Sequence, residues 1–323
     1  MFTPSRLVIW WSAIFGFAIP QCGAQTYPVR PIRLIVPYSP GGGVDVMARL
    51  IAPKLSERLG QQVVIDNRAG ATGNIGAEVA AHSAPDGYTV LMVGASIAAN
   101  VGLYRKLGYD LLKDFVAVTV VASSPNIVLV HPSLPARSIK ELIALARARP
   151  GQLNYASGGS GSTLHLTVEL FKTMAHVDIV HVPYRGTGPA IVALMSGEAL
   201  IAMPPFAGML PHIESGRLRA LAITSRSRLK IMPQLPTVAE SGVPAFESGQ
   251  WYGVLVPAGT SPAIVTKLQG ELAKVVRLPD VADQITHQGS IPVGDTSPEF
   301  ASYLREEIDK WAKVVKASGA RVE

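Results

Sequence analysis

The sequence is poor in cysteine and in charge. Its 323 residues include one cysteine, Cys22, and only 16% of them are charged. Cys22 lies in an N-terminal segment that we expect to be removed, so the mature protein has no disulfide, no thiolate metal site and no cysteine nucleophile. Its stability must therefore come from packing.

Clusters of basic residues are also missing, although the chain carries a net charge of +6. Nucleic acids and anionic lipids recruit runs of lysine and arginine, so neither is an expected partner. A hydrophobic content of 48% indicates a chain that buries much of its surface. A chain of this length suffices for two domains.

Only one long apolar run occurs, at residues 7–19, and it follows Arg6. The run is shorter than the roughly 20 residues that span a bilayer, and small residues, Gly23 and Ala24, come after it. We interpret residues 1–24 as a cleaved signal peptide, which predicts a periplasmic protein. A lipoprotein signal has Gly or Ala directly before its cysteine. Here Gln21 precedes Cys22, which argues against a lipid anchor.

Two stretches, residues 34–45 and 153–165, repeat one pattern: an apolar strand runs into a Gly/Ser loop that opens an amphipathic helix. Glycine lets the backbone approach a ligand closely, and the first turn of a helix leaves N–H donors unpaired. Such a junction attracts anionic oxygen atoms. The two junctions together predict a site for the two ends of one small anion.

Neither glycine loop matches a nucleotide-binding motif, because both lack the Lys-Ser/Thr ending of a P-loop and the spacing of a Rossmann turn. For residues 41–43 a plain tight turn remains the alternative. Asp45 is either a first-turn acid favoured by the helix dipole or a group that orients the loop or meets a ligand amine. The hydroxyls of the second loop exceed what one helix cap requires, which favours ligand contacts for some of Ser157, Ser160, Ser162 and Thr163.

Catalytic and metal chemistry find little support. His165 and Glu169 are four residues apart on one predicted helix, but no third ligand lies near them, so we expect neither a metal nor another cofactor. The window 158–162 lacks the last glycine of a Gly-x-Ser-x-Gly elbow. The sequence therefore offers no clear nucleophile.

Apolar strands alternate with helical patterns, which predicts mainly parallel sheets covered by helices. We expect strands at residues 32–36, 63–66, 89–93, 116–121, 127–130, 154–156, 179–182, 220–224 and 252–256. The predicted first helix ends at Gly60, and helix caps are expected at Ser138, Ser261 and Ser297. The last helix should bury Phe300, Leu304, Ile308, Trp311 and Val315.

Each glycine junction is expected to begin the sheet of its own lobe. We assign residues 25–124 and 251–323 to one lobe and residues 125–250 to the other, with crossings at Pro125-Asn126 and near Gln250-Trp251. Two crossings form a hinge, and a hinge beside a cleft encloses small ligands.

At these residues the chain resembles the receptors of the tripartite tricarboxylate transporter family, the Bug or TctC-like periplasmic solute-binding proteins. The resemblance covers nearly all of the mature chain. Its motifs are IRLIVP (32–37), PGGGVD (40–45), DNRAG (66–70), GNIG (73–76), PDGYT (85–89), KDF (113–115), HPSLP (131–135), LNYAS (153–157), HVPY (181–184), LRALA (218–222), LPTV (235–238) and WYG (251–253).

The resemblance implies a two-lobed Venus-flytrap fold whose two glycine-bearing loops grip a ligand carboxylate. One lobe would contribute Tyr38, Gly42, Gly43 and Asp45. The other would contribute Ser157, Ser160, Gly161, Ser162, Thr163 and His165. Ser96 and Tyr184 would add contacts that vary with the ligand. Where many relatives carry acids, residues 199–206 of this chain are apolar, so recognition of an amino group by that segment is not implied.

The leading hypothesis is a non-catalytic, monomeric receptor that closes on a small organic carboxylate and presents it to an inner-membrane permease. A second hypothesis replaces the permease with a membrane sensor kinase. A third is a periplasmic hydrolase that uses Ser160 and His165. The sequence alone does not identify the ligand.

Overall fold

The computed structural model describes residues 27–206 and 208–318. The predicted signal peptide, residues 1–24, lies outside these residues, and so does Cys22. Within the described ranges, none of the helices combines the length and the apolar character that crossing a membrane requires.

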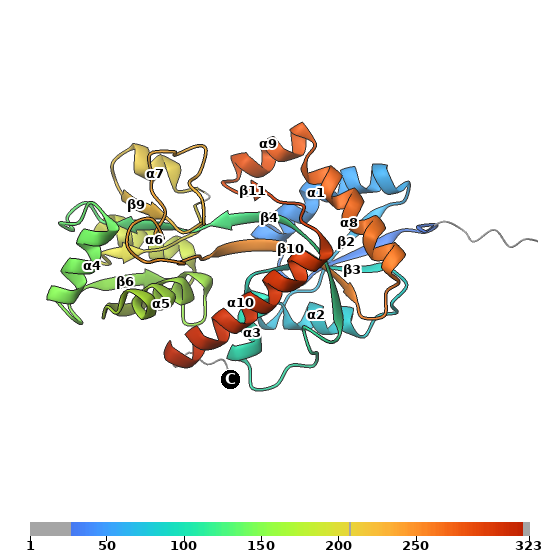
Figure 1. Ribbon diagram of the computed structural model, residues 1–323, viewed down its shortest axis with the longest axis horizontal. Coiled ribbons are helices and arrows are strands. Elements are labelled where there is room, and N and C mark those ends of the chain that lie inside the picture. Colours follow the sequence, from blue (N-terminus) through green and yellow to red (C-terminus); the bar gives the residue numbers. More distant parts are fainter. Residues whose placement is uncertain (1–26, 207, 319–323) are drawn as a thin grey trace, which may run out of the picture.

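The described chain builds two β-sheets, which lie side by side and are joined by long strands (Figure 1). The first sheet has six strands in the order β11-β4-β10-β3-β1-β2. These strands are β1 (Ile32–Val36), β2 (Val63–Asn67), β3 (Thr89–Gly94), β4 (Phe115–Pro125), β10 (Gly249–Pro257) and β11 (Ile291–Pro292). The second sheet has five strands in the order β7-β6-β8-β5-β9. These are β5 (Ile127–Val130), β6 (Asn154–Ser157), β7 (Val180–Pro183), β8 (Ile201–Ala202) and β9 (Arg219–Ile223).

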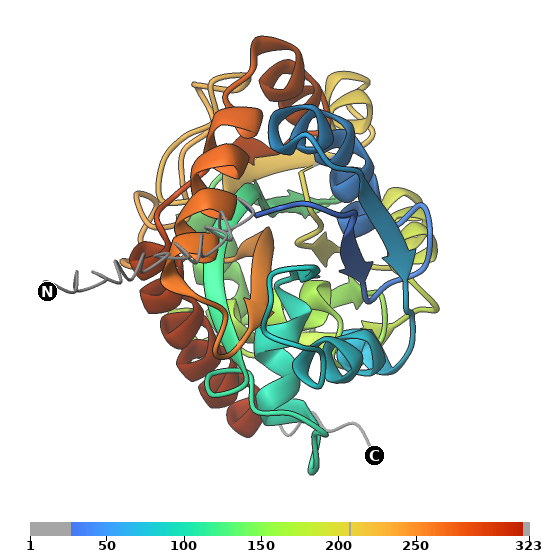
Figure 2. The ribbon, with the colours of Figure 1, turned by 90° about the vertical axis from the view of Figure 1, so that its right-hand side faces the viewer.

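Helices cover both faces of each sheet. Figure 2 views the molecule from the end that carries the first sheet, where α1 (Gly43–Leu59), α8 (Pro262–Val276) and α9 (Pro279–His287) pack on one face. The other face carries α2 (Asn74–Ala81), preceded by the short helix η1 (Ala71–Gly73), with α3 (Ser96–Leu103) and the C-terminal α10 (Ser297–Ser318). On the second sheet, α4 (Ile139–Ala148) and α5 (Thr163–Ala175) pack opposite α6 (Thr187–Ser196) and α7 (Leu210–Glu214).

The predicted two-lobed α/β class is confirmed, but the sheets are mixed rather than mainly parallel. Strand β1 pairs in parallel with β2 and β3, and β6 pairs in parallel with β7 and β8. Strand β10 runs antiparallel to both β3 and β4. It does so because it enters the first sheet from the side of the second sheet, opposite to the direction of β3.

This topology turns the carboxyl ends of the parallel strands toward each other. Strand β10 begins where the chain returns from the second sheet, and its Tyr252 lies opposite Gly94, the last residue of β3. Strand β5 likewise begins directly after β4 and runs antiparallel to β8, the parallel neighbour of β6. The loops that follow β1, β3, β6 and β7 therefore lie at the sheet ends that face the other half of the molecule.

Helix ends follow the sequence signals at all but one of the predicted positions. Gly60 ends α1 in the left-handed conformation (φ 68°), and Ser138 and Ser261 cap α4 and α8 through their side chains. The predicted cap at Ser297 is wrong. Thr296 and Glu299 form a reciprocal capping box, in which the Glu299 carboxylate accepts the Thr296 N–H at 2.8 Å. Ser297 is already helical and donates its hydroxyl to Ala117 O instead.

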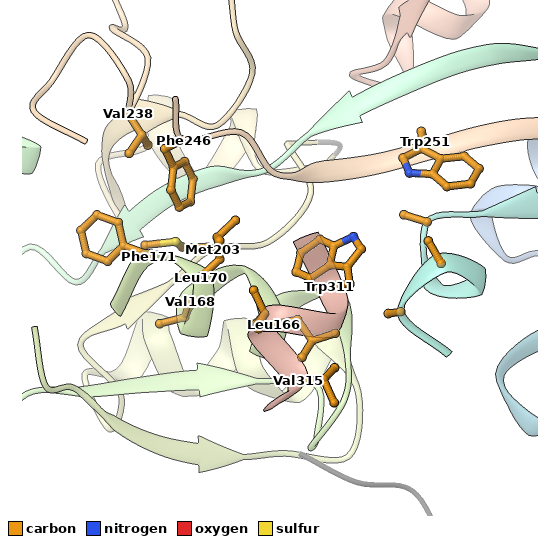
Figure 3. Close-up of a cluster of buried hydrophobic side chains, with 14 of the residues drawn as sticks. Leu166, Val168, Leu170, Phe171, Met203, Val238, Phe246, Trp251, Trp311 and Val315 are labelled. Carbon is orange, nitrogen blue, oxygen red and sulfur yellow. The ribbon is translucent and has the colours of Figure 1, made fainter. Parts of the chain in front are cut away.

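The C-terminal helix links the two halves through buried apolar contacts. All five positions predicted for its buried face are at most 8% exposed. Figure 3 shows Trp311 and Val315 of α10 beside Leu166 of α5, and one continuous cluster joins these residues to Trp251 on β10. Helix α10 therefore completes the core on both sides of the crossing strands.

Candidate ligand-binding site

The first glycine loop connects β1 to α1 and is held by Asp45. One oxygen of the buried Asp45 carboxylate accepts the Gly41 N–H at 2.8 Å and the Arg49 Nε–H at 2.9 Å. The other oxygen accepts the Asn67 amide at 2.9 Å. The Arg49 hydrogen bond is the main cause that lowers the Asp45 pKa to about 2, so the carboxylate is ionised at neutral pH. In this structure Asp45 orients the loop.

Tyr38 and Ser96 come together at the same end of the first sheet. Their hydroxyls are 2.8 Å apart, and the Gly94 N–H also points at the Tyr38 oxygen, at 3.4 Å. Burial raises the Tyr38 pKa, which keeps the phenol protonated. Ser96 is the first residue of α3, so a second helix begins beside the glycine loop.

The second glycine loop connects β6 to α5 and is braced by serines. Ser157, fully buried at the end of β6, accepts the Gly159 N–H at 3.1 Å. Ser162 caps α5 by accepting the His165 N–H at 3.2 Å, and its own hydroxyl donates to Gly159 O at 2.7 Å. The His165 Nδ1 accepts the Gly161 N–H at 3.1 Å. The loop is therefore fixed from both of its ends.

Three stacked rings, those of Tyr155, His181 and His165, lie beside this loop. His181 of β7 lies between Tyr155 and His165, with ring centroids 4.9 Å and 4.2 Å away. His181 also shares a 2.5 Å hydrogen bond with the Ser157 hydroxyl. Burial, followed by repulsion from His181, lowers the His165 pKa to about 4, and burial lowers that of His181. Both imidazoles are therefore neutral at pH 7, as an acceptor Nδ1 on His165 requires.

The hydroxyls of Ser160 and Thr163 are left available. Ser160 is exposed at the tip of the loop, and Thr163 is the first residue of α5. Within residues 27–206 and 208–318, neither hydroxyl has a hydrogen-bond partner. Such groups, beside the N–H groups of a helix start, suit an anionic oxygen.

Tyr184 is placed differently from the other predicted residues. Its N–H bonds to Ser157 O at 2.9 Å, which keeps its backbone beside the second loop. Its ring, however, packs against the apolar cluster under α6. Burial and the nearby Glu198 carboxylate raise its pKa, and its hydroxyl is buried. The structure therefore does not bring the Tyr184 hydroxyl together with those of the loops.

A polar network connects the second loop to both crossings. Thr167, one turn into α5, shares a 2.6 Å hydrogen bond with the Ser248 hydroxyl and accepts the Asn126 amide at 2.8 Å. Asn126 follows β4, and Ser248 precedes β10. The helix that begins at the second glycine loop is therefore hydrogen-bonded to both places where the chain passes between the sheets.

The sequence missed His181 as a partner of Ser157, although the HVPY motif contains it. The motif lies on β7, which pairs in parallel with β6, and this pairing places His181 opposite Tyr155. For the hydrolase hypothesis, Ser160 and His165 share no hydrogen bond, because the His165 Nδ1 takes the Gly161 N–H. Within the described ranges no group of three or more potential metal ligands comes together.

The two mixed sheets, joined by crossing strands and carrying one braced loop each, define a two-lobed solute-binding protein. Residues 47–320 match the tripartite tricarboxylate transporter family receptor, TctC. The chain belongs to that family, whose members are solute-binding receptors.

Individual relatives agree with this assignment over nearly the whole chain. The chain is 40% identical to Protein BugT of Bordetella pertussis over 313 residues, which are 96% of each chain. It is similar in structure to Rpa4515 of R. palustris, solved with adipate, at a TM-score of 0.75 and 40% identity, over 92% of this chain and 100% of the other. It is also similar to MatC of Rhodopseudomonas palustris, solved with bound malate, at a TM-score of 0.71 and 32% identity, over 90% and 100%.

Proposed function

We propose that this protein is a periplasmic receptor that captures a small organic dicarboxylate between the loops at residues 41–43 and 158–162 and delivers it to a tripartite tricarboxylate transporter permease. The predicted signal peptide at residues 1–24 would direct the export.

The observation that carries the proposal is the pair of loops at facing sheet ends. Each loop opens a helix, α1 or α5, whose first N–H groups point out of the helix. A carboxylate at each helix start would gain hydrogen bonds from N–H groups and the field of the helix dipole. Two such positions suit a ligand with an anionic group at each end.

The relatives support this ligand class. Rpa4515 was solved with adipate and MatC with malate, and both molecules carry two carboxylates. Both loops are also held by hydrogen bonds from within the chain, so they keep their shape without a ligand. Because Arg49 is held by Asp45, the first loop offers neutral donors and no free cation.

Capture would require the two lobes to approach each other. In this proposal the lobes are residues 25–124 with 251–323 and residues 125–250, and they rotate about the crossings near Pro125 and Gln250. The network of Asn126, Thr167 and Ser248 links the second loop to these crossings. A permease would then recognise the closed arrangement.

Thermal unfolding with carboxylic acids tests the binding step. We expect adipate or malate, at about 100 times its dissociation constant, to stabilise the protein by about 2.7 kcal/mol. Adipamide is the matched control ligand, since it keeps the carbon chain and removes both charges, and we expect it to have no effect. A protein that responds to no mono-, di- or tricarboxylate, or equally to adipamide, contradicts the proposal.

Delivery is tested in cells that lack the receptor gene. We expect uptake of the bound acid to be lost and to return with the gene. Uptake that persists while an acid-dependent transcriptional response disappears would contradict the permease role and support the sensor kinase.

A further inference from the structure

One residue of a crossing strand faces the first glycine loop. Along β10, Trp251 points to the face that carries α10, where it packs on Phe300, and Tyr252 points to the opposite face with α1. The register between β10 and β4 shifts between Tyr252 and Gly253. Such irregularities in a β-ladder change the direction of a side chain and often occur next to functional sites.

The Tyr252 hydroxyl is directed at the first residue of α1. A β-carbon on Gly43 would lie only 2.7 Å from the Tyr252 oxygen, closer than nonbonded atoms approach. Gly43 is helical and has no positive φ, so glycine is needed at this position for space and not for backbone conformation. Gly43 and Tyr252 therefore fit each other as a pair.

This hydroxyl is not used inside the described part of the chain. Tyr252 is 8% exposed, so more than nine-tenths of it is buried, yet its oxygen has no hydrogen-bond partner among residues 27–206 and 208–318. Burial raises the Tyr252 pKa to about 12, which keeps the phenol a neutral donor at any physiological pH. The oxygen is not one of the fully enclosed polar atoms that lack a partner in the described residues, so the ring is buried while the hydroxyl reaches solvent and is open to a ligand.

The helix start beside it also has free donors. The first bond of α1 runs from the Val46 N–H to Gly42 O at 2.9 Å. The N–H groups of Gly43, Val44 and Asp45 precede that turn and lack an acceptor within the helix. An anionic oxygen placed here would meet these N–H groups and the Tyr252 hydroxyl together.

We propose that the Tyr252 hydroxyl donates a hydrogen bond to the ligand carboxylate held at the N-terminus of α1. This inference rests on the proposed carboxylate-binding function and adds a contact from the crossing strand β10. The ligand would then touch the segment about which the two lobes turn. If Tyr252 only packed in the core, its hydroxyl would not be needed for ligand binding.

The test compares Tyr252→Phe with Tyr303→Phe by isothermal titration with adipate and with malate. Tyr303 packs against Trp251 on the opposite face of the first sheet, so its variant removes the same atom away from the loops. We expect Tyr252→Phe to weaken binding about ten- to a hundredfold, as the loss of a hydrogen bond to a charged acceptor does. We expect Tyr303→Phe to bind like the wild type, and the melting temperature of ligand-free Tyr252→Phe not to fall.

The outcomes separate this inference from the proposed function. If the wild type binds neither acid, both are contradicted. If the wild type binds and Tyr252→Phe binds equally well, only the inference is overturned. It is also overturned if ligand-free Tyr252→Phe unfolds at a lower temperature, since the hydroxyl would then have a structural partner.

A second pair of variants checks the geometry without any ligand. Gly43→Ala should lower the melting temperature, because its β-carbon collides with the Tyr252 oxygen. The same change in a Tyr252→Phe background should be tolerated, since the ring carbons lie 3.4 Å from that β-carbon. Equal losses in both backgrounds would show that the hydroxyl does not face α1 and would overturn the inference.

Discussion

Asp45 is the residue on which the shape of the first glycine loop depends. Its carboxylate joins Gly41, Arg49 and Asn67, and the Arg49 bond lowers its pKa from 3.8 to about 2. A carboxyl with a lowered folded-state pKa stabilises the protein above its unfolded value, and this stabilisation is lost as the pH falls through the folded value.

We therefore expect Asp45→Asn to reduce the free energy of unfolding at pH 7 by about 2 kcal/mol. The difference from the wild type should shrink as the pH falls from 4 to 2, because the wild-type carboxylate is protonated in that interval. Urea unfolding of both proteins at pH 7, 4 and 2 measures this. A difference that stays constant with pH would contradict the role given to the carboxylate charge.

Single residues were predictable where the backbone chemistry is local. The sequence predicted that helices begin at Gly41 to Gly43 and at Ser162, because a helix start favours glycine and hydroxyl residues. The direction of the Tyr252 side chain was not, because it depends on pairing with β4, which is distant in sequence. The pairing of Ser157 with His181 escaped for the same reason.

The start of α5 is where an element and the candidate site meet. Removing the cap in Ser162→Ala should destabilise the protein by about 1 kcal/mol and also weaken carboxylate binding, because the Ser162 hydroxyl holds Gly159 O. Ser138→Ala removes an equivalent cap from α4, which is remote from both loops. It should lower stability by a similar amount and leave binding unchanged. Denaturant unfolding and adipate titration of the two variants check this, and equal binding losses would contradict a special role for the α5 start.

Elements with a clear pattern were predicted well from the sequence. The strands at residues 32–36 and 127–130 have the predicted bounds, because continuous apolar runs end at turn residues. Strands β8 and β11 were missed, since each has two residues and shows no periodicity. Strand β10 begins three residues before its predicted start, because Gly249 and Gln250 are not typical strand residues.

The whole molecule shares one buried cluster that passes through α10. The Glu307 carboxylate accepts the indole N–H groups of Trp251 and Trp311, both at 3.0 Å, and Trp311 packs toward α5 of the second half. The two halves are therefore expected to unfold together rather than in sequence.

Calorimetry tests this cooperativity. We expect one transition for the ligand-free protein, with equal calorimetric and van't Hoff enthalpies. Trp311→Ala should destabilise the protein by about 3–5 kcal/mol, because it empties a large buried site next to both halves. Two resolved transitions in the wild type would contradict a shared core.

At this scale the sequence indicated two sheets and the return of the chain, because the strands alternate with helices and two glycine junctions recur. It did not indicate that the last helix packs against both halves. The buried face of α10 was predicted correctly from its periodicity, but periodicity does not say which elements a face contacts.

The position of β10 also constrains how the protein can acquire its structure during synthesis. Strand β10 lies between β3 and β4, so two strands made early are separated in the sheet by one made near the end. A nascent chain that stops before residue 249 exposes the facing edges of both strands and cannot complete the first sheet. The first sheet can therefore be completed only after residues 249–257 have been synthesised, late in translation.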